Sequence, residues 1–201
     1  MITICLAHPK GGVGRSTSTY MLGVELAALR PDKTVGVTDA DQARHLSRMW
    51  ELSPPTAPNL RLEAVWPDVR LVDTAPEANY AALRSQADRA DWLLVPVKGP
   101  EAGSVQVLPA FLRWFADQGT ACRLLGFLPT MYKPRRAEAQ RWLGQLELLA
   151  ARYQARVFDP IPDSAALAAW ETRGHPYAAL AREVWAMTVP DASMTTPTGG
   201  S

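Results

Sequence analysis

The residues with the clearest chemical potential form a glycine-rich loop near the start of the chain, residues 9–17, which read PKGGVGRST. An apolar run, residues 2–7, precedes this loop, and apolar residues at helical spacing follow it from Met21 to Leu29. A turn between a strand and a helix brings successive backbone N–H groups together, and the helix dipole adds partial positive charge. We therefore predict that residues 9–17 bind an anion.

The residue types within the glycine-rich loop indicate that this anion is a phosphate. Gly11, Gly12 and Gly14 allow the backbone to adopt positive φ values and to approach a phosphate closely. Ser16 and Thr17 follow in the first turn of the predicted helix, where a hydroxyl can reach a phosphate or its magnesium ion. The combination is typical of a nucleotide site.

Carboxylates follow two further predicted strands. The strand over residues 34–38 runs into Asp39 and Asp41, and the apolar strand over residues 69–73 ends in Asp73. In doubly wound sheets, ligands bind at the carboxyl ends of parallel strands. Magnesium prefers carboxylates and hydroxyls together with waters and phosphates, so Asp73 and the Ser16 hydroxyl are candidates for a metal site. The competing interpretation is that Asp73 caps the turn that follows it.

The elements that must position these groups alternate along the chain. Strands are predicted at residues 2–7, 34–38, 60–65, 69–73, 92–97, 123–128 and 156–158, the third of them at a sheet edge. Helices are predicted after the glycine-rich loop and at residues 43–52, 79–90, 105–117, 136–153, 164–172 and 176–187. This alternation favours an α/β fold: a doubly wound, mostly parallel sheet with helices on both faces. We expect a single domain over residues 1–189 and a disordered tail over residues 190–201.

Composition narrows the class of protein. The chain has 201 residues, of which 47% are hydrophobic and 20% charged, as in an ordinary soluble domain. No apolar run is long enough to span a membrane and no signal peptide is apparent, so a cytoplasmic location is expected. Cys5 and Cys122 lie in apolar runs and are predicted to be buried thiols. The net charge is only +1, but residues 123–156 hold seven basic residues against two acidic ones.

The glycine-rich loop departs from the strict P-loop pattern G-x-x-x-x-G-K-[ST] at two positions, because Pro9 replaces the first glycine and Arg15 replaces the lysine. It matches instead the variant K-G-G-x-G-K-[ST]-[ST], with Lys10 as the early lysine and Arg15 in place of the later one. The stretch therefore resembles the deviant Walker loop of the ParA/MinD family of ATPases, and most closely the small ParA-like partition ATPases.

Further motifs extend the resemblance in chain order from Met1 to about Met187. Asp39-Ala40-Asp41-Gln42 is similar to the family's D-x-D-P-Q motif without its proline, and Asp73-Thr74-Ala75-Pro76 is similar to D-T-P-P. Later segments that resemble family motifs are Leu94-Val95-Pro96-Val97, Thr130-Met131-Tyr132, Ile161-Pro162 and Gly174-His175-Pro176. The resemblance implies that the cofactors are ATP and Mg²⁺.

The resemblance also implies roles around the phosphates. Lys10 would reach across a homodimer interface to the partner's phosphates. Arg15 would face the β- and γ-phosphates, and Thr17 would contact the α-phosphate. The backbone amides that would wrap the phosphates belong to Gly11, Gly12, Val13 and Gly14.

On the metal side, Ser16 would ligate magnesium directly, while Asp39 and Asp73 would hold it through water. Asp41 would position or activate the attacking water. The Ile161-Pro162 loop would border the adenine. Phosphoryl transfer depends mainly on positioning and charge stabilisation, and this set of cations and carboxylates supplies both.

The resemblance implies partners as well. Small ParA-like ATPases bind nucleoid DNA without sequence preference when dimeric, and they work with a ParB-like or cargo adaptor protein. The candidate DNA-binding residues are Lys133, Arg135, Arg136, Arg141 and Arg173, because lysine and arginine contact phosphate without reading bases. The competing interpretation is a solvated helix face rich in arginine. A membrane partner is not expected, since residues 190–201 show neither an apolar nor a basic helical face.

The leading hypothesis is thus an ATPase that forms an ATP-sandwich dimer and positions a plasmid, a chromosome or another cargo, with slow, partner-stimulated hydrolysis. Arg15 raises an alternative, because arginine is a planar fork on a longer stem and does not substitute conservatively for lysine at a tight site. The alternative is a nucleotide-binding switch with little or no hydrolysis. A third hypothesis, an ATP-dependent metabolic ligase, would need a substrate pocket from additional insertions.

Overall fold

The computed structural model describes residues 1–76, 81–135, 137–164 and 176–188. Its centre is a seven-stranded sheet in the order β3-β2-β4-β1-β5-β6-β7, in which every neighbouring pair is parallel. The strands are β1 (Ile2–Leu6), β2 (Val35–Ala40), β3 (Leu60–Leu62), β4 (Val69–Thr74), β5 (Trp92–Lys98), β6 (Arg123–Thr130) and β7 (Arg156–Val157). The predicted doubly wound fold is confirmed, and residues 60–62 form the predicted edge strand.

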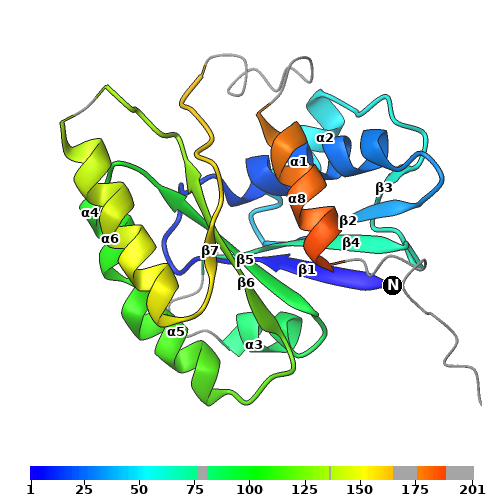
Figure 1. Cartoon of the computed structure of the whole chain (residues 1–201). Coiled ribbons are helices and arrows are strands. Elements are labelled where there is room, and N and C mark those ends of the chain that lie inside the picture. The colour runs from blue at the N-terminus through cyan, green and yellow to red at the C-terminus, as the bar shows by residue number, and fades with distance from the viewer. Residues whose placement is uncertain (77–80, 136, 165–175, 189–201) are drawn as a thin grey trace, which may run out of the picture.

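Helices cover both faces of this sheet (Figure 1). One face carries α1 (Arg15–Leu29), α2 (His45–Leu52) and α8 (Tyr177–Thr188). The other carries α3 (Ala81–Ala87), α4 (Ala102–Gln106), α5 (Leu108–Asp117) and α6 (Glu138–Arg152). Most of the helix predicted at residues 164–172, and the tail predicted at residues 190–201, lie outside the described residues.

Alternation along the central strand explains why two separate cores form. Ile4 and Leu6 pack on the α1 side, whereas Cys5 and Ala7 pack on the α5 side, and all four are fully buried. A parallel strand covered on both faces reads as a continuous apolar run, which is why the sequence located these strands. Cys5 and Cys122 are buried free thiols, as predicted.

Several helix boundaries differ from the prediction: α2 begins at His45, two residues late, and α3 ends at Ala87, three residues early. Residues 105–117 form two helices, α4 and α5, which meet at Val107, and Pro109 lies in the first turn of α5. Proline has no N–H to donate to the preceding turn, so it favours the start of a new helix over the continuation of an old one. The helix predicted to start at residue 136 begins at Glu138.

The carboxyl ends of the inner strands meet at one edge of the sheet. The connection from β1 to α1 lies there, and Asp39 of β2 and Asp73 of β4 are register partners in neighbouring strands. Paired residues of parallel strands point to the same face, so both carboxylates lie on the α1 side.

None of the described helices is both long and apolar enough to cross a membrane.

Candidate functional site

Two of the three glycines predicted to allow positive φ values in the glycine-rich loop have them, and Gly11 does not. Gly12 and Gly14 have φ values of 71° and 83°, in the left-handed region that favours glycine. Gly14 is the N-cap of α1, and no side chain caps that helix end. The first N–H groups of α1 therefore have no side-chain acceptor, which is the arrangement that binds an anion.

Two buried side chains fix the loop to the rest of the sheet edge. The Thr130 hydroxyl donates to the Val13 carbonyl at 2.7 Å. The His8 ring, 1% exposed, accepts from the Lys10 N–H through Nδ1 and donates from Nε2 to the Ser104 carbonyl, both at 2.9 Å. Burial lowers the pKa of His8 to about 4, so the ring is neutral at physiological pH. His8 thus connects the loop to α4.

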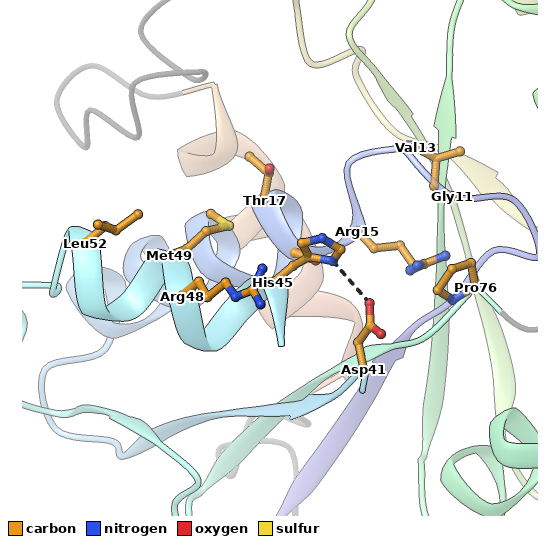
Figure 2. A pocket seen from close by; sticks show the side chains of 12 residues that line it. Gly11, Val13, Arg15, Thr17, Asp41, His45, Arg48, Met49, Leu52 and Pro76 are labelled. Atoms are coloured by element: carbon orange, nitrogen blue, oxygen red, sulfur yellow. Dashed lines mark hydrogen bonds and ion pairs between the residues drawn. The ribbon is translucent and has the colours of Figure 1, made fainter. Parts of the chain in front are cut away.

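Arg15 lies beneath the loop. Its side chain is buried, and Nη1 donates to the carbonyls of His8 at 2.7 Å and Lys10 at 3.2 Å. Burial lowers the pKa of this guanidinium, and the nearby carboxylates of Asp73 and Asp41 oppose that shift. Figure 2 shows the guanidinium directed away from α2 and toward Pro76. The cation that replaces the P-loop lysine is therefore bonded to the loop's own backbone.

Lys10 does not line the cavity. Its Nζ forms an ion pair with Glu101, and the same carboxylate pairs with Lys98 at 3.0 Å. Glu101 immediately precedes α4, so the early lysine of the motif is bound to the neighbouring loop of its own chain.

Asp73 has the environment of a carboxylate that needs a cation. It is fully buried, and neither carboxylate oxygen has a hydrogen-bond partner. Burial raises the pKa of Asp73 to about 7, while the neighbouring Ser16 hydroxyl and Arg15 guanidinium act in the opposite direction. A buried carboxylate without a partner, beside a hydroxyl, fits a hydrated magnesium ion. The described part of the chain contains no cluster of three His, Cys, Asp or Glu side chains, so magnesium would also need water and phosphate ligands.

The other two predicted carboxylates have different surroundings. Asp39 accepts hydrogen bonds from the N–H and hydroxyl of Ser47, at 2.8 and 2.7 Å, so it is engaged with α2. Asp41 accepts from the Ala43 N–H at 2.9 Å and faces His45 Nδ1 at 3.4 Å. Figure 2 shows His45 over Asp41 on the α2 side of the site.

A cavity of about 440 Å³ brings most of these groups together. Its lining comes from the loop, from the end of β2, from α2 and from the segment after β4 (Figure 2): Gly11, Gly12, Val13, Arg15, Ser16, Thr17, Asp41, His45, Arg48, Met49, Leu52 and Pro76. Ile161 and Pro162 are not part of it. Ile161 is buried in the core, and its N–H donates to the Pro129 carbonyl at 2.8 Å.

Four residues at or near the site were not predicted from the sequence: His8, His45, Arg48 and Glu101. His8 directly precedes the glycine-rich loop, and His45 and Arg48 follow Asp41 at a spacing of four and seven residues, which places them on one side of a helix. These positions in the sequence could have indicated that the three residues lie near the site. Glu101 had no such signal, because 91 residues separate it from Lys10.

Three of the five candidate DNA-binding residues lie in the part of the chain that the structure describes. Lys133 pairs with Asp163 at 2.7 Å, whereas Arg135 and Arg141 are exposed, the latter on α6. Arg136 and Arg173 lie outside the described residues.

Comparison with known proteins gives a family and a fold. Residues 4–177 match the family described as the CobQ/CobB/MinD/ParA nucleotide binding domain. No curated protein sequence matches the chain.

Three solved structures are similar over nearly their whole length. The septum site-determining protein MinD of Pyrococcus horikoshii with Mg-ADP has a TM-score of 0.71 and 16% identity, over 92% of this chain and 96% of that one. Apo McdA of Cyanothece has a TM-score of 0.70 and 16% identity, over 90% of this chain and 93% of that one. Cobyrinic acid a,c-diamide synthase of Mycobacterium smegmatis with an ATP analogue and magnesium has a TM-score of 0.69 and 20% identity, over 92% of this chain and 96% of that one. Identities this low show that the fold is shared.

Proposed function

We propose that this chain, which belongs to the CobQ/CobB/MinD/ParA family of nucleotide-binding domains, is an ATPase that binds Mg·ATP at the glycine-rich loop. One observation carries the proposal: an uncapped helix end with two left-handed glycines, Gly12 and Gly14, lies beside the buried, unpartnered carboxylate of Asp73. The backbone N–H groups would bind the phosphates, and Asp73 would hold the metal that accompanies them. Two of the similar solved structures hold a nucleotide and magnesium, which supports this assignment.

Each side chain has a definable part in the reaction. Ser16 and Asp73 would hold magnesium, which would supply positive charge opposite the phosphates. Arg15 places a permanent positive charge under the loop, since a guanidinium does not deprotonate in proteins. Asp41, which lines the cavity and keeps its carboxylate oriented through the Ala43 N–H, orients the attacking water. Asp39 orders α2 through Ser47, and so supports Asp41 from the same connection.

Beyond the nucleotide site, the proposal includes an ATP-dependent homodimer that binds DNA without sequence preference, positions a cargo with a ParB-like or other adaptor, and is cytoplasmic. Lys10 supports the dimer, because it is the early lysine of the motif and yet does not line the cavity of its own chain. The name of one similar structure, the septum site-determining protein MinD, is in keeping with a positioning ATPase. The similarity to cobyrinic acid a,c-diamide synthase keeps the ligase as the competitor to be tested.

The test measures phosphate release from Mg·ATP, with and without double-stranded DNA. We expect slow release in wild type and release reduced at least about tenfold in Asp41→Ala, with Mg·ATP binding retained, because removal of a water-orienting group affects chemistry more than binding. Gln42→Ala, on the same exposed connection, is the control and should behave like wild type. Equal turnover in Asp41→Ala and wild type would remove Asp41 from the mechanism.

A second candidate function has its own observation. Arg15 is bonded to two loop carbonyls, and that arrangement is suited to holding a nucleotide without rapid turnover. Tight Mg·ATP binding without phosphate release, in the presence and absence of DNA, would favour the switch over the ATPase.

A further inference from the structure

The ion pair between Lys10 and Glu101 joins two connections that both lie at the carboxyl edge of the sheet. Lys10 belongs to the glycine-rich loop after β1, and Glu101 belongs to the connection between β5 and α4. The two residues are 91 positions apart in the chain, so the contact depends on the fold and is not a local helical pair. About two-fifths of the Lys10 side chain remains exposed, so the ammonium group is near solvent as well as near Glu101.

The backbone of Glu101 is fixed by hydrogen bonds from two side chains. The Ser104 hydroxyl and the Trp142 indole N–H both donate to the Glu101 carbonyl, at 2.7 and 3.2 Å. Ser104 in turn accepts from His8, which also receives the Lys10 N–H. The carboxylate and the start of the glycine-rich loop are therefore positioned by one connected set of hydrogen bonds.

Gly103 leaves the space that Lys10 occupies. A Cβ at Gly103 would lie 3.2 Å from Lys10 Nζ, which is closer than ordinary van der Waals contact. A larger residue at position 103 would therefore crowd the ammonium group as it now lies.

Lys98 gives the carboxylate a second cation. Its Nζ lies 3.0 Å from the other carboxylate oxygen of Glu101, so Glu101 stays paired if Lys10 departs. The two lysines lower the pKa of Glu101, Lys10 being the larger influence, and the carboxylate is ionised at neutral pH. Departure of Lys10 consequently leaves no unpaired carboxylate behind.

We propose that Glu101 is the positioning residue for Lys10: it holds the ammonium group within its own chain and thereby opposes the ATP-dependent dimer until Lys10 is released to the partner's phosphates. The inference rests on the proposed function, since it presupposes that Lys10 acts across a dimer interface. It adds a determinant of the monomer–dimer equilibrium that lies outside the nucleotide cavity.

The test is a sedimentation-velocity titration of protein concentration at saturating Mg·AMPPNP. In Glu101→Gln the amide holds Lys10 less strongly, so the apparent dimer dissociation constant should fall about two- to fivefold, as expected for a half-exposed ion pair. Glu101→Asp keeps the charge and should remain nearer to wild type than Glu101→Gln. Lys98→Met is the matched control: it removes the other cation from the same carboxylate, strengthens the claim of Glu101 on Lys10, and should leave the dissociation constant unchanged or raise it.

The outcomes distinguish failure of the proposed dimer from failure of the proposed role of Glu101. If wild type binds Mg·AMPPNP but stays monomeric at every concentration, the proposed dimer is wrong. If wild type dimerises and Glu101→Gln dimerises equally well or less well, the positioning role is wrong, and weaker dimerisation would mean that Glu101 contacts the partner subunit. Fluorescent-nucleotide binding to each variant, measured below the dimerisation range, should equal that of wild type and confirms that the variants are folded.

Discussion

At the scale of single residues, the unusual feature is the arginine at the position of the P-loop lysine. Sequence motifs placed Arg15 at the start of the helix that follows the glycine-rich loop, but they could not give the direction of its side chain. Its Nη1 donates to the His8 and Lys10 carbonyls, whereas Nε of the same buried guanidinium has no hydrogen-bond partner. The replacement therefore changes how the loop is held together.

This arrangement predicts the effect of Arg15→Lys. A lysine ammonium is compact and has rotatable donors, so it can leave the loop carbonyls for a phosphate more readily than a planar guanidinium. Phosphate release in Arg15→Lys should be equal to wild type or severalfold faster, while the free energy of unfolding without nucleotide should fall by about 1 kcal/mol because a buried charged hydrogen bond is lost. Hydrolysis that is abolished in Arg15→Lys would show that the guanidinium itself is required.

His8 makes stability depend on pH. The pKa of His8 falls from 6.5 to about 4 on folding, so between these values the unfolded chain binds a proton that the folded chain does not. Stability contributed by the neutral ring is therefore present above pH 6.5 and is lost as the pH falls toward 4, by about 3 kcal/mol in total.

The measurement is urea unfolding of wild type and His8→Gln at pH 7, 6 and 5. Glutamine offers a donor and an acceptor but does not titrate, so the loss of stability between pH 7 and pH 5 should be smaller in the variant. Identical pH dependence in the two proteins would mean that His8 titrates normally in the folded state.

At the scale of elements, the strands were predictable and the contacts between loops were not. Buried parallel strands produce apolar runs, so β1, β2, β4, β5 and β6 could be located from the sequence. The engagement of Asp39 with Ser47, and the burial of Ile161 away from the cavity, depend on how α2 and β7 pack, which no local pattern encodes. The motif residues were therefore placed at the right edge of the sheet without their individual partners.

The end of β6 supports the glycine-rich loop, and this support can be tested at Thr130. Its buried hydroxyl donates to the Val13 carbonyl at 2.7 Å, so Thr130→Val should lower the unfolding free energy by about 1–2 kcal/mol and weaken Mg·ATP binding as the loop loosens. Thr188→Val is the matched control, because that buried hydroxyl also donates to a carbonyl at 2.7 Å, within α8. It should reduce stability without changing nucleotide affinity; equal effects of both variants on affinity would contradict a specific role for Thr130.

At the scale of the whole molecule, the distribution of charge leads to the DNA-binding prediction. Arg135→Glu/Arg141→Glu reverses two exposed cations within residues 123–156, the stretch rich in basic residues. The change should weaken binding to every DNA sequence tested and flatten the dependence of affinity on salt. The double variant Arg61→Glu/Arg89→Glu makes the same change in net charge at exposed positions on β3 and after α3. Fluorescence anisotropy in Mg·AMPPNP measures both. Equal losses in the two double variants would indicate a general charge effect in place of a binding surface.

The central claim is that Mg·ATP binds at the glycine-rich loop. Calorimetric titration of Gly12→Ala tests this claim most directly. Gly12 and Gly119 are matched: they have φ values of 71° and 63°, and a Cβ at either would have no atom within 4 Å. Alanine should therefore cause similar backbone strain at both positions, about 1 kcal/mol. Gly12 lines the cavity in which we propose that the phosphates bind, whereas Gly119 is not among the residues that line it. We predict one Mg·ATP site per chain in wild type and in Gly119→Ala, and at least tenfold weaker binding in Gly12→Ala. Undiminished binding in Gly12→Ala, or no binding in wild type, would contradict the central claim.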